Sequence, residues 1–171
     1  MKALKIILLL LIATSLQAQY RGYVLCEIPQ NKKHVSIYLN HIWSEVKECS
    51  EKYNIPMALI LAQCCLESKY GKSHYATTRN NHLGIKYEGV YACFDSFKAC
   101  LDAYGRTLSK ACYKDMQPRT LMEWIESLRY ECCTYATSPN YSKKLKSIIK
   151  AYNLDVIPYN YVNDNFVKYK K

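Results

Sequence analysis

The sequence has few residues that interrupt regular structure. Only 5 glycines and 5 prolines occur among 171 residues. No stretch is rich enough in Gly, Pro or Ser to read as a low-complexity linker, and no segment repeats another. These absences argue against a repeat protein and against two domains joined by a flexible tether. The length is that of a single domain with a proper hydrophobic core.

Acidic residues are also scarce, with 14 Asp and Glu against 24 Lys and Arg, which gives a formal net charge of +10. A basic chain of this kind can meet anionic wall polymers, membranes or nucleic acid. No zinc-ligand spacing and no aromatic RNA-binding motif accompany the charge, so no nucleic-acid partner is expected. Solubility alone is the ordinary explanation for such a charge.

Long apolar runs are absent after the first 18 residues, so no later membrane span is predicted. Those first residues carry Lys2 and Lys5, a short apolar run from Ile6 to Ile12, and small residues near Ala18. This pattern predicts a secretory signal peptide over 1–18, followed by an exported chain that begins near Gln19. An uncleaved membrane anchor is the alternative.

The nine cysteines show no Cys-x-x-Cys spacing, which argues against a redox motif or a zinc site. Export makes disulfides plausible, but the odd count leaves at least one thiol unpaired within the chain. The adjacent pairs, Cys64 with Cys65 and Cys132 with Cys133, are poor candidates because vicinal bridges are strained. The alternative is that several cysteines are small buried apolar residues.

Apolar periodicity and capping residues predict a mainly helical domain. A lead-in over 19–33 precedes helices over 34–53, 56–71, 97–109, from Thr120 to about Leu128, and from Ser138 onward. The segment 72–81 is expected to be irregular. Two short strands over 83–87 and 90–94, joined by Glu88-Gly89, predict one small hairpin. Asp95 and Ser96 offer a cap for the next helix. Residues 155–171 form a basic, aromatic tail.

Glu67 is the acid that stands out, because it lies near the end of the apolar helix that begins at Pro56. The negative end of the helix dipole and the apolar neighbours both favour the protonated carboxyl. A raised pKa suits a general acid that works near neutral pH. A solvated Glu on an outer helix face is the alternative interpretation.

Three runs of residues resemble the glucosaminidase family of peptidoglycan hydrolases, glycoside hydrolase family 73. Residues 67–73 read Glu-Ser-Lys-Tyr-Gly-Lys-Ser, residues 80–86 read Asn-Asn-His-Leu-Gly-Ile-Lys, and residues 135–141 read Tyr-Ala-Thr-Ser-Pro-Asn-Tyr. They match the family's Glu-Ser-x-aromatic-Gly-x-Ser and Asn-Asn-x-(Phe/Leu)-Gly-Ile-Lys motifs, and a downstream tyrosine motif. The resemblance implies a lysozyme-like domain over 34–154, mainly α with a reduced β-hairpin.

The resemblance also implies an endo-β-N-acetylglucosaminidase that cleaves cell-wall glycan with Glu67 as general acid, in a periplasmic or secreted location. Tyr135 and Tyr141 match motif tyrosines and are candidate catalytic residues. Glycosidases usually add a second carboxylate. The region that carries it in the family is cut short here, which leaves Glu88 as the candidate second acid. Assistance by the substrate's own N-acetyl group is the alternative.

The same motifs suggest a set of substrate-binding residues, each of which has core packing or loop support as its alternative role. They are Ser68, Tyr70, Asn81, Gly84 and Lys86. No metal and no cofactor is expected. Two other functions remain open: a lytic transglycosylase, which also uses one Glu and leaves an anhydro-muramic end, and a wall-binding module without catalysis.

Overall fold

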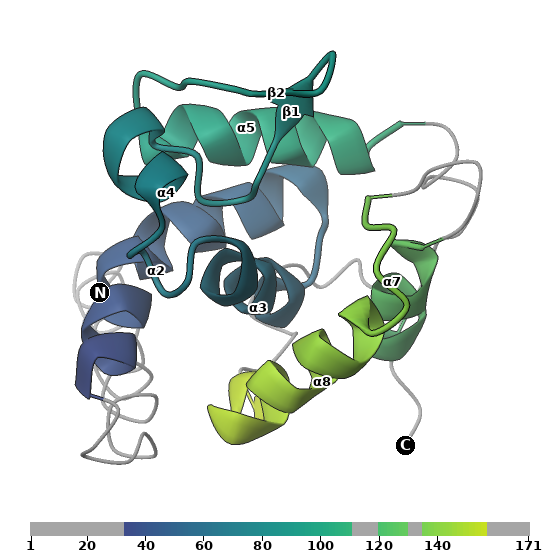
Figure 1. The fold of residues 1–171 in the computed structure, drawn as a ribbon. Coiled ribbons are helices and arrows are strands. Elements are labelled where there is room, and N and C mark those ends of the chain that lie inside the picture. The colour runs from purple at the N-terminus through teal and green to yellow at the C-terminus, as the bar shows by residue number, and fades with distance from the viewer. Residues whose placement is uncertain (1–32, 111–119, 130–134, 157–171) are drawn as a thin grey trace, which may run out of the picture.

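Helix α3 (Met57–Glu67) lies at the centre of the fold because nearly all of its faces are apolar. Every residue from Met57 to Cys65 is buried. The helix contacts α2 (Lys33–Tyr53), α7 (Leu121–Ser127), α8 (Tyr141–Ala151) and the 3-10 turn η3 (Leu154–Val156). Figure 1 shows α3 in the middle of the computed structural model, beside α2 and α8. The structure describes residues 33–110, 120–129 and 135–156.

The described residues confirm the predicted fold class, a mainly helical domain with one small hairpin. Strands β1 (Lys86–Tyr87) and β2 (Val90–Tyr91) pair antiparallel, with Lys86 opposite Tyr91. Glu88 and Gly89 both have positive φ, 51° and 82°, as a tight two-residue hairpin turn requires. The strands are shorter than predicted, because Leu83 enters the core and Gly84 has a φ of +66°.

One prediction for the segment before the hairpin is wrong. Residues 74–79, expected to be irregular, form helix α4 (His74–Arg79). The Ser73 side chain accepts a hydrogen bond from the Ala76 amide and begins the helix, and Asn80 ends it in the left-handed conformation. The helix lacks an apolar stripe, so periodicity could not reveal it, although both capping residues are types that favour these positions.

Several helix ends also differ from the predicted ones. Helix α3 ends at Glu67 rather than at Gly71, because Lys69 and Tyr70 already have positive φ. Of the two predicted cap residues, Ser96 caps helix α5 (Phe97–Leu108), which ends one residue before the predicted Ser109. The predicted capping box at Thr120 is present and opens α7, which ends at Ser127. Helix α8 begins at Tyr141, three residues after Ser138.

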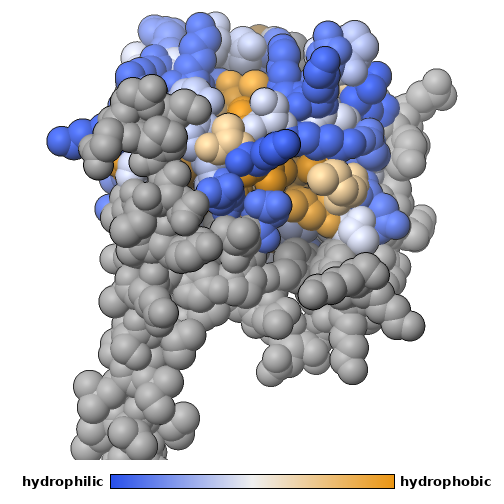
Figure 2. Space-filling model, turned by 90° about the horizontal axis from the view of Figure 1, so that it is seen from below, coloured by the Kyte–Doolittle hydropathy of each residue, from blue (hydrophilic) through white to orange (hydrophobic). Residues whose placement is uncertain are grey.

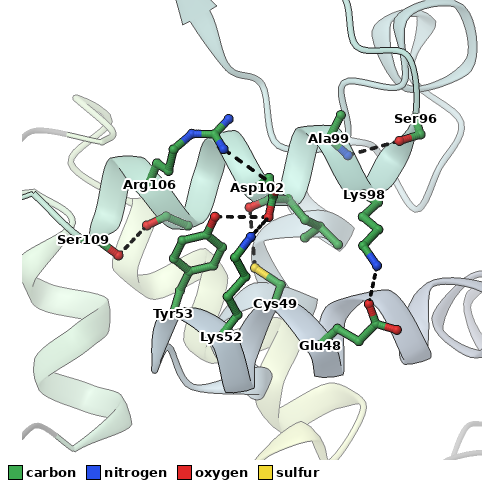
Figure 3. A network of polar contacts seen from close by, with 12 residues as sticks. Glu48, Cys49, Lys52, Tyr53, Ser96, Lys98, Ala99, Asp102, Arg106 and Ser109 are labelled. Atoms are coloured by element: carbon green, nitrogen blue, oxygen red, sulfur yellow. Dashed lines mark hydrogen bonds and ion pairs between the residues drawn. The ribbon is translucent and has the colours of Figure 1, made fainter.

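Polar contacts join the C-terminal end of α2 to the first half of α5 (Figure 3). Asp102 on α5 accepts hydrogen bonds from the Lys52 ammonium and the Tyr53 hydroxyl, at 2.9 and 3.1 Å. Lys98, in the first turn of α5, pairs with Glu48 at 2.6 Å. Because these pairs are solvent-exposed, each adds little stability, and the buried apolar residues between the helices hold them together.

Within the described ranges, no helix is both long and apolar enough to cross a membrane. Figure 2 shows one face on which apolar side chains gather near the middle, with hydrophilic side chains above and beside them. Cys49, Cys64, Cys65 and Cys100 are buried free thiols, and Cys93 is an exposed one. The predicted signal peptide, the tail after residue 156, and four cysteines lie outside the described residues.

Candidate active site

The carboxyl group of Glu67 sits at the last residue of α3, half-buried among other side chains. Burial raises its pKa above the ordinary value, while the Tyr141 hydroxyl and the nearby Lys144 ammonium oppose that rise. Desolvation is the largest of these effects. A carboxyl in this setting holds its proton more tightly than one in water, which is the property that a general acid needs.

The Tyr141 hydroxyl donates a hydrogen bond to Oε1 of Glu67 at 2.7 Å. Tyr141 is the first residue of α8, and its side chain is buried against α3. The sequence places the two residues 74 positions apart, so this contact depends on the packing of α8 on α3. Tyr141 and Glu67, both predicted from the motifs, therefore lie together.

Gly84 lies against the other carboxyl oxygen. A Cβ atom at this position would stand 3.0 Å from Oε2 of Glu67, and the positive φ of +66° disfavours any side chain. Glycine thus allows the backbone of the loop to approach the carboxyl group closely.

Two predicted residues hold this loop in place. The buried Asn81 side chain donates to the carbonyls of Ile85 and Ala92 and accepts from the Ile85 amide, at 2.8 to 3.0 Å. Tyr135 donates from its hydroxyl to the Leu83 carbonyl at 2.7 Å. Gly84 lies between these anchors. The side chains of Asn81 and Tyr135 bond backbone groups, and these bonds hold the Gly84 loop in position beside the Glu67 carboxyl group.

Ser68 is fully buried and organises the turn that follows Glu67. Its hydroxyl accepts from the Gly71 amide at 2.6 Å and lies within hydrogen-bond distance of the Cys64 carbonyl and the Tyr38 hydroxyl. A Cβ atom at Gly71 would stand 2.7 Å from the Tyr38 ring, so the turn passes close over α2. The buried Ser68 hydroxyl is therefore positioned to shape the end of α3 rather than to meet a ligand.

Tyr70 and Lys86, two of the predicted substrate-binding residues, contact aromatic rings. The half-buried Tyr70 ring packs edge-on against His34 and Tyr152, with centroids 5.9 Å apart in both pairs. The exposed Lys86 ammonium lies 4.4 Å from the centroid of the Tyr91 ring in the hairpin. Neither residue has a polar contact with Glu67 among those that the structure describes.

Glu88, the candidate second acid, occupies the exposed tip of the hairpin at a φ of +51°. Turn position and exposure leave its side chain in solvent. The charged residue that affects the pKa of Glu67 is Lys144 on α8, not Glu88. The hairpin tip is therefore a poor place to fix a catalytic base in the geometry described.

Two buried residues near the motif residues, Gln63 and Tyr104, were not identified from the sequence. Gln63 donates from Nε2 to the Tyr141 hydroxyl at 3.1 Å, and its Oε1 accepts from the Tyr104 hydroxyl at 2.5 Å. Both side chains are fully buried. A polar residue four positions before Glu67, on an otherwise apolar helix, was the signal that could have identified Gln63.

The matched region of the chain decides its family. Residues 43–154, more than half of the chain, match the glucosaminidase family, described as mannosyl-glycoprotein endo-beta-N-acetylglucosaminidase. The chain belongs to the glucosaminidase family. The match contains the Glu67, Gly84 and Tyr141 positions described above.

Individual relatives of this glucosaminidase-family chain are distant. It is 24% identical over 148 residues to exo-glucosaminidase LytG of Bacillus subtilis, a match that covers 70% of this chain and 52% of LytG. The chain thus spans about half the length of that relative. Its fold is similar to the catalytic domain of the autolysin Auto from Listeria monocytogenes, with a TM-score of 0.62, 23% identity, and coverage of 80% and 94% of the two chains.

A third similarity involves a longer protein. The N-acetylmuramoyl-L-alanine amidase from Staphylococcus aureus matches with a TM-score of 0.64 and 24% identity, covering 80% of this chain and 45% of that one. The two solved structures support a shared fold, and the lysozyme-like domain predicted from the sequence is confirmed.

Proposed function

We propose that this chain is a peptidoglycan hydrolase, an endo-β-N-acetylglucosaminidase in which Glu67 is the general acid. The observation that carries the proposal is the Glu67 carboxyl group itself. It is half-buried, its pKa is raised by desolvation, Tyr141 hydrogen-bonds one oxygen, and a glycine lies against the other. Membership of the glucosaminidase family supports a glycan substrate, and the basic chain suits an anionic wall.

In the proposed reaction, Glu67 transfers its proton to the glycosidic oxygen as the bond to the anomeric carbon breaks. The N-acetyl carbonyl of the same sugar attacks that carbon and replaces the broken bond. Water then adds to the anomeric carbon, the acetamido group is released, and the Glu67 carboxylate recovers a proton from the water. The net change is hydrolysis, with Glu67 unchanged and without a second protein carboxylate.

The exposed position of Glu88 supports this single-acid proposal. We expect Glu67→Gln to reduce the rate by about 10²–10⁴-fold, because glutamine keeps the shape but has no transferable proton. Glu88→Gln is expected to cost less than about tenfold, and Tyr141→Phe more than Glu88→Gln, because Tyr141 contacts the carboxyl group. Rates on soluble glycan fragments, measured beside clearing of purified wall, test the order.

The measured order distinguishes the alternatives. A loss in Glu88→Gln as deep as that in Glu67→Gln would restore a two-carboxylate mechanism. Equal failure of wild type and Glu67→Gln to clear the wall, with both still pelleting on it, would identify a wall-binding module instead.

Mass spectrometry of the products tests the bond and the chemistry. Hydrolysis after N-acetylglucosamine adds one water and leaves a reducing N-acetylglucosamine end. A lytic transglycosylase leaves an anhydro-muramic end without added water. The name of the relative LytG also makes exo-cleavage a candidate. Products of many lengths at early times support endo-cleavage, whereas a single short product from the start would indicate exo-cleavage.

The proposed substrate also implies export, because the wall lies outside the cytoplasm. The basic and apolar pattern of residues 1–18 supports a cleaved signal peptide. Mass spectrometry of the protein recovered from the cell exterior would identify the first residue, which we expect near Gln19.

A further inference from the structure

The buried amide of Gln63 connects two tyrosines that lie on different helices. Its Oε1 accepts from the Tyr104 hydroxyl of α5, and its Nε2 donates to the Tyr141 hydroxyl of α8 at 3.1 Å. Gln63 and Tyr104 are completely buried, and Tyr141 is 4% exposed. Both ends of the amide are therefore engaged, and water does not compete for either end.

These contacts set the direction of the next hydrogen bond. An amide whose oxygen accepts from Tyr104 must present its NH₂ group to Tyr141. The Tyr141 oxygen then acts as an acceptor toward Gln63, and its own hydrogen points to Oε1 of Glu67 at 2.7 Å. The three bonds run one way, from Tyr104 through Gln63 and Tyr141 to Glu67.

We propose that Gln63 is a positioning residue that fixes Tyr141 as a donor to Oε1 and thereby keeps the transferable proton of Glu67 on Oε2. An oxygen that accepts from Tyr141 is the carbonyl-like oxygen of the protonated carboxyl group, so the hydroxyl hydrogen belongs on the other one. Oε2 is the oxygen that faces Gly84, where no side chain intervenes. The inference rests on the proposed role of Glu67 as general acid.

The other groups near Glu67 do not determine which of its two oxygens carries the proton. Lys144 and Tyr141 act on it from α8, Tyr135 lies across from it, and Cys64 is on its own helix. The exposed Lys144 ammonium favours the carboxylate form by its charge, whereas Tyr141 donates a hydrogen bond to one oxygen, Oε1. The Tyr135 hydroxyl is committed to the Leu83 carbonyl. The selection of Oε1 therefore depends on Tyr141 and on Gln63 behind it.

The test is a titration of the Glu67 side-chain carbon by ¹³C NMR in the full chain, with Glu67→Gln used to assign the signal. Gln63→Met keeps the length of the side chain but cannot hold the Tyr141 hydroxyl. We expect the Glu67 pKa to rise by about one unit, the value of one hydrogen bond to a charged group. The alkaline limb of the rate profile should move up equally, because the acid remains protonated to higher pH.

A double-mutant cycle separates positioning from a general structural effect. Tyr141→Phe removes the donor and should raise the Glu67 pKa by itself. Adding Gln63→Met to Tyr141→Phe should produce no further rise, because Gln63 acts through the missing hydroxyl. An unchanged pKa in Gln63→Met, or an equal rise in both backgrounds, would overturn the proposal.

A further variant keeps the inference testable if Gln63→Met does not fold by circular dichroism. Tyr104→Phe removes the donor that fixes the orientation of the Gln63 amide, so the amide is free to rotate. It is expected to raise the Glu67 pKa, and the absence of a rise would refute Gln63 as the cause. The titration needs no substrate. Inactive protein with the predicted titration would refute only the proposed function.

Discussion

At the residue scale, uncharged polar side chains shape the surroundings of Glu67. Gln63, Ser68 and Asn81 are each at most 1% exposed, and each makes at least two hydrogen bonds. A buried polar group is costly unless it is satisfied in this way. Sequence reasoning identified Ser68 and Asn81 only through their motifs, and it missed Gln63. The position of Gln63 on an apolar helix could have marked it, but its two tyrosine partners lie 41 and 78 positions away and cannot be predicted from the local pattern.

His82, inside the second motif, gives a pH prediction at this scale. Its half-buried ring lies against Phe97, and Nδ1 is 2.9 Å from the Tyr38 hydroxyl. Burial, with a smaller effect of His41, lowers its pKa to about 4. The unfolded chain takes up this proton near pH 6.5 and the folded chain does not. We therefore expect stability to be lost as the pH falls from about 6.5 to about 4.

Urea denaturation at several pH values measures this loss. The His82 contribution is on the order of 1–2 kcal/mol once solvent screening of the partly exposed ring is allowed for. His82→Gln should flatten the pH dependence in that window, whereas replacement of the exposed His74 by Gln should not. Identical slopes in wild type and His82→Gln would contradict the assignment.

At the scale of elements, periodicity predicted the long helices well and the short ones poorly. Helices α2, α3 and α5 carry enough apolar positions to define a face or a wholly buried element. Helix α4 has six residues and one buried side chain, Ala76, so capping is its main local signal. The hairpin was predictable from Glu88-Gly89, but its strand lengths depend on Leu83 entering the core.

The contact between α2 and α5 gives a prediction for an element pair. A methyl group at Gly105 of α5 would overlap the ring of Tyr53, the residue that ends α2. In an isolated helix, Gly→Ala is stabilising by about 1 kcal/mol. Here we expect Gly105→Ala to destabilise the protein by about 1–3 kcal/mol, because overpacking outweighs the helix preference. Urea unfolding gives the value.

Two controls accompany that measurement. Thr107→Ala, on a half-exposed position of the same helix, should change stability by less than about 0.5 kcal/mol. The cost of Gly105→Ala should shrink when Tyr53 is also replaced by Ala, since the overlapping ring is then gone. A stabilising Gly105→Ala would show that the helices separate without cost.

At the scale of the whole molecule, the cysteines test how closed the described domain is. Cys49, Cys64, Cys65 and Cys100 are buried, whereas Cys93 is exposed. Burial raises the pKa of Cys49 and Cys65 to about 12 and that of Cys100 to about 11, so reactive thiolate is scarce. We expect native alkylation to label Cys93 quickly and the other four only after unfolding.

Peptide mapping by mass spectrometry reads this outcome residue by residue. Alkylation of the four buried thiols at the rate of Cys93 would mean that the domain opens readily. Resistance of any of them even in denaturant, reversed by a reducing agent, would instead reveal one of the disulfides that export makes plausible.

The sequence was sufficient for the fold class and for the pairing of Glu67 with Tyr141 in one site, since the motifs that carry both could be recognised. It was insufficient for the environment of that pair. The approach of Gly84, the loop anchors and the Gln63 connection arise from contacts between segments that only the folded chain brings together.

The contact between α3 and α8 also has a kinetic consequence. The two helices are separated by more than seventy residues in the chain, yet α8 covers α3 and supplies the hydroxyl that meets Glu67. Contacts of such high sequence separation slow folding, because a long loop must close before they form. During synthesis, α3 is made well before α8, so its apolar surface stays uncovered until α8 has been made. The core and the proposed acid site are then completed in the same late step.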